Sequence, residues 1–202
     1  MRTTGRISII TCLAALLSLT APPAQAAPQA PAAVALPAVG AVVTLKLSAP
    51  GTEIKIGAKS VKVDLSGDVV LRVVAGDADP LKAVRLRVLD LNLAGKLPKG
   101  DVTIRPIGYD VAAAGELRLN VGVPPTLNHS LVLGFRIVVN QPEISPKPIE
   151  LSSKDVARLA GKLKTFPPLG DLHQLQDPVD LIDDAKPSVT AGVIAKLGLK
   201  VG

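Results

Sequence analysis

Period-two alternation of apolar residues is the feature that most constrains the fold of this 202-residue chain. The alternating apolar positions are Val43, Leu45, Leu47, Val61, Val63, Leu65, Val69, Leu71, Val73, Val84, Leu86, Val88, Leu117, Leu119, Val121, Val123, Leu131, Leu133, Phe135, Ile137 and Val139. Turn signals such as LSGD, LPKGD and AAAGE separate these segments at spacings typical of antiparallel meanders. The pattern predicts a mainly β fold, an antiparallel sandwich or barrel-like domain, with one or two short helices in the C-terminal quarter.

The segment KAVRLRVLDLNLAG, residues 82–95, contains a break in this alternation. Its first alternating apolar residues end at Val88, and a second alternating series begins at Leu89. The two series therefore meet at adjacent positions instead of two residues apart. A shift of one residue moves every following side chain to the opposite face of the sheet unless an extra residue is inserted. We therefore expect a β-bulge near Leu89.

Basic residues occupy many of the positions between the apolar ones. If Leu86 faces the core, Arg85 and Arg87 must point to water, because side chains alternate along a strand. One interpretation is a solvated face that keeps the strands soluble and discourages pairing with other chains. The other is a basic surface for an anionic partner, such as an envelope polymer or a membrane surface, with Arg85 and Arg87 as candidate binding residues.

Residues 1–26 have the pattern of a secretory signal peptide. Two arginines precede a short apolar run, and Ala24 and Ala26 are the small residues that a signal peptidase reads, so cleavage is expected before Ala27. The apolar run is shorter than the roughly 20 residues that cross a bilayer, and no later segment is long and charge-free enough. We expect a secreted or extracellular protein with no transmembrane span.

The rest of the chain divides by composition. Residues 27–39 are rich in alanine and proline and carry no charge, which predicts an extended linker. Residues 40–140 contain the alternating segments and form the expected antiparallel β-domain. Residues 141–202 begin with a proline-rich connection, and an amphipathic helix and a C-terminal return strand are expected to pack on the β-domain. The one cysteine, Cys12, lies within the signal, so the mature chain must rely on a core rather than on disulfides.

The helix is expected in the segment LSSKDVARLAGKLKTFPP. Its apolar residues follow the helical spacing i, i+3, i+4, i+7, and they are Val156, Leu159, Ala160 and Leu163. Its opposite face carries three cations at intervals of four, Lys154, Arg158 and Lys162, which are further candidate binding residues. Such a helix can lie on an anionic membrane or dock on the β-domain, and its thin apolar stripe favours docking. A second short helix is expected to start at Asp177.

Composition argues against several classes of partner. Aromatic residues make up 1% of the chain, whereas sites for sugars or single-stranded nucleic acid usually offer aromatic faces. The formal net charge of +6 includes the two arginines of the signal, and the remaining cations are dispersed along the chain. A nucleic-acid partner is therefore not expected.

The sequence contains no recognisable catalytic motif. It has neither a G-x-S-x-G elbow nor an S-x-x-K pair, and the mature chain has no cysteine, so we predict no catalytic residue and no enzyme activity. His173 lies among several aspartates, but a catalytic zinc site normally uses two or more histidines, and His129 is far away in the sequence. We interpret the segment around His173 as an acidic surface cap, and we predict no metal and no cofactor.

These observations leave two hypotheses of function. The first is an exported, non-catalytic β-domain that acts by surface contact in the cell envelope or the extracellular space. The alternative is a carrier of an apolar, lipid-like ligand in a cavity lined by leucine, valine and isoleucine. The bias toward alanine, valine, leucine and proline resembles that of small exported proteins from high-GC bacteria.

Overall fold

The computed structural model describes residues 34–76, 79, 81–108 and 115–202. These residues form thirteen antiparallel strands of one sheet, and none of them is helical. The mainly β, antiparallel fold class is therefore confirmed. The expected signal peptide and the first part of the expected linker lie outside the described residues.

Three long strands come first in the chain: β1 (Val42–Ile56), β2 (Lys59–Val74) and β3 (Ala83–Leu97). The other ten are β4 (Gly100–Pro106), β5 (Gly115–Asn120), β6 (Thr126–Leu133), β7 (Phe135–Asn140), β8 (Ile149–Ser153), β9 (Ala157–Leu163), β10 (Leu172–Leu175), β11 (Val179–Asp183), β12 (Lys186–Lys196) and β13 (Gly198–Val201). Their sequences alternate between buried apolar and exposed polar residues, as strands with one buried face do.

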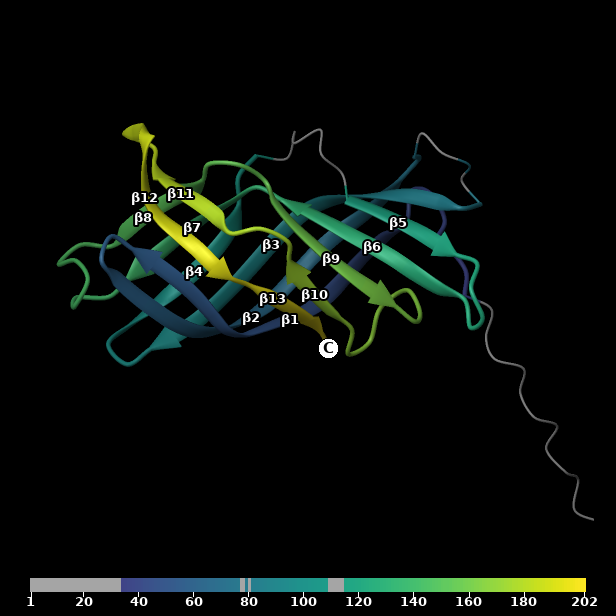
Figure 1. The fold of residues 1–202 in the computed structure, drawn as a ribbon, viewed down its shortest axis with the longest axis horizontal. Helices are drawn as coiled ribbons and strands as arrows, with labels where there is room; N and C mark the ends of the chain where they lie inside the picture. The colour runs from purple at the N-terminus through teal and green to yellow at the C-terminus, as the bar shows by residue number, and fades with distance from the viewer. Residues whose placement is uncertain (1–33, 77–78, 80, 109–114) are drawn as a thin grey trace, which may run out of the picture. The chain divides into compact units, whose positions relative to one another are not determined.

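The shorter strands form two groups along the long ones (Figure 1). β3 pairs with β5 through its first residues and with β4 through its last, while β1 pairs first with β13 and then with β12. We call β5, β6, β9, β10 and β13 the β6 half, and β4, β7, β8, β11 and β12 the β7 half. The β7 half lies on the left of Figure 1 and the β6 half on the right.

The chain passes between the two halves at short interruptions. Gly134 separates β6 from β7, residues 154–156 separate β8 from β9, residues 176–178 separate β10 from β11, and Leu197 separates β12 from β13. Each of these strand pairs is therefore one long strand with a break near its middle. β4 and β5 can be counted in the same way as one broken strand. The described residues then form eight long strands, of which β1, β2 and β3 are unbroken and five are broken. The last of these, β12 with β13, pairs with β1.

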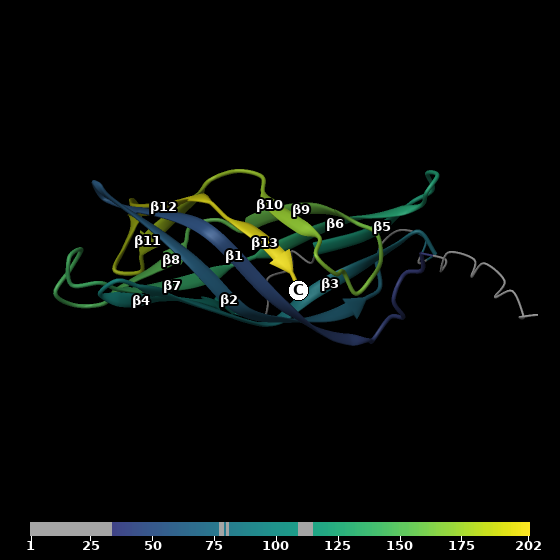
Figure 2. The ribbon, with the colours of Figure 1, turned by 90° about the horizontal axis from the view of Figure 1, so that it is seen from below.

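The inward side chains of both halves form a single hydrophobic core. It is built from leucine, valine and isoleucine, and Phe135 is the one fully buried aromatic side chain among the described residues. Figure 2 shows β2, β3 and β4 in one layer and β12, β10 and β9 in the layer above. The core residues come from both layers. Scarcity of aromatic residues thus leaves a densely aliphatic interior.

The β-bulge expected in β3 is confirmed. Val70 of β2 lies opposite Asp90, and the next residue, Leu71, lies opposite Val88, so Leu89 has no partner in this ladder. The extra residue lets the buried set continue from Leu86 to Leu91 on the same face.

The expected helices are wrong. The segment predicted as an amphipathic helix forms β8 and β9, and the predicted second helix forms β11. A spacing of four residues satisfies the period of a strand as well as that of a helix, so Leu159 and Leu163 both point inward from β9. The C-terminal stretch forms β12 and β13, which pair with β1.

Within the described part of the chain, no helix could serve as a membrane span.

Candidate functional site

A hollow of about 510 Å³ lies on the outer face of β5, β6 and β9 in the β6 half. Two rows of side chains line it, and in each row the residues are direct partners on neighbouring strands. The first row is Glu116, Ser130 and Ala160, and the second is Arg118, Asn128 and Lys162. Small ligands usually occupy clefts of about 300 to 1,000 Å³, so the hollow has the size of a ligand site.

Small residues account for the depth of this hollow. Ser130, Ala160 and Gly161 lie next to one another on β6 and β9. The backbone amide of Glu116 donates a hydrogen bond of 3.0 Å to the Ser130 hydroxyl, which holds that side chain against β5. The floor is therefore short and rigid, and the longer polar side chains stand around it.

The rim of the hollow carries charge of both signs. Arg118 Nη2 lies 2.7 Å from Glu116 Oε1, and both side chains are about half exposed. Lys162 has no ion pair with any of the described residues and lies two strands away from Arg118, with Asn128 between them. One cation is partly neutralised and the other is uncompensated, so the rim as a whole is positive.

Two histidines point into the interior of the β6 half, and one of them, His129, is also among the residues that line the hollow. His129 of β6 and His173 of β10 are 3% and 2% exposed, and His129 Nδ1 lies 2.7 Å from His173 Nε2. Their rings meet edge to face, with centroids 4.6 Å apart. β9 runs between β6 and β10, and its residue at this level is Gly161, which has no side chain to separate the rings.

Gly161 is what permits this contact. A Cβ atom built there would lie 2.8 Å from the backbone oxygen of Leu172 and 2.9 Å from Cδ2 of His173. Any other residue would therefore push the His173 ring away from His129. We call His129, His173 and the gap at Gly161 the histidine pair.

Burial decides the protonation of the histidine pair. Loss of solvation, with a smaller contribution from the nearby His173 ring, lowers the pKa of His129 to about 3. Burial also lowers the pKa of His173, although the Asp171 charge and a hydrogen bond with the Leu199 backbone oppose this. Both rings are neutral at physiological pH.

The structure places the five predicted binding residues on different parts of the surface. Arg85 lies across from Glu116 at the edge of the β6-half hollow, and Lys162 lines it. Arg87 is exposed on β3 opposite Arg72, another cation. Lys154 lies in the break between β8 and β9, and Arg158 lines a separate hollow of about 330 Å³ with Asp155, Asp177 and Asp180.

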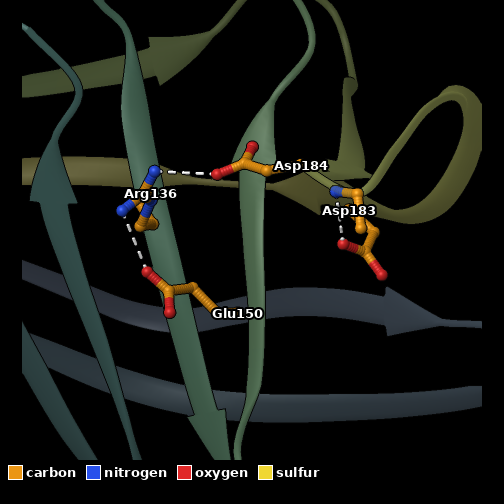
Figure 3. Close-up of polar contacts among 5 residues, drawn as sticks. Arg136, Glu150, Asp183 and Asp184 are labelled. Atoms are coloured by element: carbon orange, nitrogen blue, oxygen red, sulfur yellow. Dashed lines mark hydrogen bonds and ion pairs between the residues drawn. The ribbon is translucent and has the colours of Figure 1, made fainter.

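The β7 half has its own hollow, of about 540 Å³, where charges are compensated differently. Arg136 of β7 lies 3.0 Å from Glu150 and 2.8 Å from Asp184, so one guanidinium binds two carboxylates (Figure 3). The neighbouring Asp183 accepts a hydrogen bond from the backbone amide of Ala185. These contacts join β7, β8 and the turn after β11 across the surface.

The interpretation of His173 as part of an acidic surface cap is wrong. His173 points into the core rather than toward the aspartates that surround it in the sequence. Among the described residues, no group of three or more histidine, cysteine, aspartate or glutamate side chains is placed to hold a metal ion. Sequence reasoning missed the histidine pair, although His129 continues the inward series Leu131, Leu133, Phe135 by one step toward the N-terminus.

Comparison with known proteins gives one likeness in fold. No family model and no curated protein matches the chain. A solved structure of DynF, from the dynemicin biosynthesis pathway of Micromonospora chersina, superposes with a TM-score of 0.68 at 16% sequence identity, over 87% of this chain and 86% of that one. The two proteins therefore share a fold.

This likeness corrects the prediction that the chain is not an enzyme. DynF belongs to a biosynthesis pathway, and it has the same fold. The absence of familiar nucleophile motifs therefore does not exclude catalysis for a chain of this fold. What the comparison supports of the predicted function is the β-domain fold alone.

Proposed function

We propose that the protein binds a small anionic molecule with an apolar body in the β6-half hollow. The observation that carries this proposal is the combination of a ligand-sized hollow, a floor of small residues and a positive rim at Arg118 and Lys162. Ligand sites combine apolar surface with a few polar groups that set orientation. Here the floor takes the apolar body and the rim takes the anion.

The spacing of the two cations fits a carboxylate or a phosphate between them. Arg118 and Lys162 are partners of Asn128 on either side, and neighbouring strands are about 4.8 Å apart, so their Cα atoms are about 10 Å apart. An anion centred above Asn128 is within reach of both side chains. Asn128 adds an amide donor, and the Glu116 carboxylate disfavours a second anionic group on the same side.

We also propose that the protein works outside the cell that makes it. Support comes from the sequence, in which the charged start, the apolar run and the Ala24-Gln25-Ala26 site follow the order of an export signal. Amino-terminal sequencing of protein recovered from its native host should find Ala27 at or near the terminus. An intact Met1 on protein retained in the cytoplasm would contradict export.

Calorimetry with decanoate below its micelle concentration tests the binding proposal. The wild type should bind decanoate, and decyltrimethylammonium, which has the same chain and the opposite charge, should bind much more weakly. Replacing Arg118 and Lys162 together with glutamine should weaken decanoate binding about tenfold, because two charge-assisted contacts are lost. Added salt should weaken wild-type binding, since the rim is exposed.

The matched control is Arg105→Gln, which removes an exposed cation that lines the β7-half hollow. It should leave decanoate affinity unchanged. Equal binding of the two surfactants, or an unchanged affinity in the Arg118 and Lys162 double variant, would refute the proposal.

A further inference from the structure

The exposed apolar residues of this protein gather at one end of the sheet. Because the eight long strands run antiparallel in sequence order, every second connection between them lies at the same end. Residues 34–41 and 121–125, the described part of 75–82, and residues 164–171 therefore share one end, which we call the entry end. It lies on the right of Figure 1, where β5 ends and β6 begins.

Almost all of the exposed large hydrophobic residues belong to the entry end. Those exposed among the described residues are Val39, Val42, Leu81, Val121, Val123, Leu169, Leu172 and Val189. All of them except Val189 lie in the entry-end segments or are the first residue of the strand that follows such a segment. An exposed apolar side chain is common on protein surfaces, but a group of them at one place indicates an interaction surface.

Four of these residues are almost fully exposed, and we call them the aliphatic tips. Leu81, between β2 and β3, is 80% exposed, and Leu169, between β9 and β10, is 77% exposed. Val121 and Val123, between β5 and β6, are 89% and 103% exposed. Exposure of this degree leaves each side chain surrounded by water, so a partner that removes that water gains binding energy from it.

The opposite end of the sheet is built differently. Its charged side chains form ion pairs with one another, because Lys99 lies 2.8 Å from Glu143 and Lys96 lies 3.7 Å from Asp101. Outside the entry end, Val189 is the one exposed large hydrophobic residue in the described part of the chain. The aliphatic tips are therefore a property of one end and are not general to the turns of this fold.

Basic residues stand close behind the aliphatic tips. The exposed cations in the entry-end segments, or within two residues of a strand terminus at that end, are Arg72, Lys82, Arg118, Lys162, Lys164 and Lys200. Among the described residues, the acidic side chains in the same zone are Asp79 and Asp171, and Asp79 lies 3.8 Å from Lys82. The cations outnumber the carboxylates, so the entry end is positively charged and complements an anionic partner.

The backbone beside one tip has few groups that need water. Pro124 and Pro125 follow Val123 and are exposed, and proline has no backbone N–H group. A backbone donor without a partner is costly in a hydrocarbon environment. The tip at Val123 can therefore leave water with a smaller loss of hydrogen bonds than an ordinary turn.

We propose that the entry end binds the surface of an anionic lipid membrane. The aliphatic tips enter the boundary between headgroups and acyl chains, and the cations behind them face the lipid phosphates. The tips stand on three separate connections, and a fluid surface surrounds each of them without needing a complementary pocket. The contact is peripheral, because only the tips leave water.

Flotation with lipid vesicles tests the proposal. The wild type should bind vesicles of equal parts phosphatidylcholine and phosphatidylglycerol, and it should bind phosphatidylcholine vesicles much more weakly. Replacing Leu81, Val121, Val123 and Leu169 together with serine should weaken binding to the anionic vesicles about tenfold or more, because the apolar contacts are lost. All four residues are exposed, so the variant should fold. An unchanged affinity in this variant would overturn the proposal, and Val189→Ser is the control that should bind as the wild type does.

A fluorescent reporter tests the contact at a single tip. The chain contains no tryptophan, so Val123→Trp introduces the one tryptophan of the protein. Anionic vesicles should shift its emission to shorter wavelength, and lipids brominated on their acyl chains should quench it. Val189→Trp should show neither effect. Absence of both effects at Val123→Trp, or equal effects at the two positions, would overturn the proposal.

Sedimentation without lipid tests the other possible occupant of the tips, a second copy of the chain. The wild type should be a monomer, and the emission of Val123→Trp should be that of a tryptophan in water. A dimer that the serine variant dissociates would overturn the proposal, because protein would then cover the tips.

Decanoate binding separates this inference from the function proposed for the hollow. The aliphatic tips are not among the residues that line the hollow, so the serine variant should bind decanoate as the wild type does. Failure of the wild type to bind decanoate would refute the proposed ligand of the hollow and would leave the vesicle results unaffected.

Discussion

The two halves of the closed sheet use the same long strands but satisfy their polar groups differently. In the β7 half the polar groups meet on the outer surface, where Arg136 binds Glu150 and Asp184, and the interior strands present apolar side chains such as Ile137. In the β6 half two histidines lie in the interior, and one ring nitrogen has no partner. The β7 half also has an unsatisfied buried atom, Gln141 Oε1, but it belongs to a half-buried side chain just after β7, whereas the histidine nitrogen lies in the core. An unsatisfied group inside a core calls for an explanation, and it points to the β6 half as the functional one.

The largest expected effect tests whether the halves share one core. Leu159 of the β6 half and Ile137 of the β7 half are both fully buried. Replacing either with aspartate buries an unpaired charge and should destabilise the protein by about 4 kcal/mol or more, or prevent folding. Chemical denaturation measured by circular dichroism should show one transition in each variant. Loss of one half with the other intact, seen by hydrogen exchange, would mean that the halves fold separately.

A smaller effect is expected at the gap that defines the histidine pair. Gly161→Ala should destabilise the protein by about 1 to 3 kcal/mol, because its Cβ would overlap the Leu172 oxygen and the His173 ring. It should also break the contact between the histidines, which NMR would show as a change in the imidazole resonances. Gly122→Ala is the control, since its Cβ would lie no closer than 3.6 Å to a neighbour. Unchanged histidine resonances in the Gly161 variant would contradict this account.

The pH dependence of stability should also come from the β6 half. An unfolded histidine has a pKa near 6.5, while burial lowers the pKa of His129 to about 3, so the unfolded chain binds more protons between these values. The contribution of the neutral histidines to the free energy of unfolding should be greatest above about pH 6.5. Below that pH the free energy of unfolding should fall, by up to about 1.4 kcal/mol per pH unit for each histidine. Denaturant titrations between pH 4.5 and 7 would measure this slope. Replacing both histidines with glutamine should flatten it.

The smallest effects are expected on the outer surface. Arg136→Gln removes two ion pairs that are about half exposed, and it should reduce stability by about 1 kcal/mol or less. Arg87→Gln should change stability by no more than about 0.5 kcal/mol, and in the favourable direction, because Arg87 faces Arg72 across the strands. Thermal denaturation at low and physiological salt would separate the two. A larger loss at Arg87 than at Arg136 would reverse this ranking.

Much of this fold is readable from local patterns. Strands follow from the alternation, and the bulge at Leu89 follows from the one-residue shift in β3. The segment around Leu159 was misread as a helix because a spacing of four fits both periods, and the inward position of Gly161 carries no apolar signal. The local sequence alone cannot show that the segment around Leu159 is a strand or that Gly161 faces inward, because the neighbouring strands decide both.

The candidate sites were less accessible from sequence. His129 follows an inward series, but its contact with His173 depends on β9 lying between β6 and β10 and on a glycine at the right level. The rim of the hollow depends on the same strand order, which brings Arg118 and Lys162 to either side of Asn128. These are relations between strands that are distant in sequence, and no single strand contains them.

The pairing of β1 with β12 and β13 joins the two ends of the described chain. Every other strand pairing joins residues fewer than about 40 positions apart in the sequence, so those contacts close shorter loops and can form earlier. The seam between the first and last strands closes the largest loop and should form last during folding. Until then both edges remain open to strands of other molecules, so removing residues 198–202, which pair with β1 and β10, should increase edge-to-edge association, measured by light scattering.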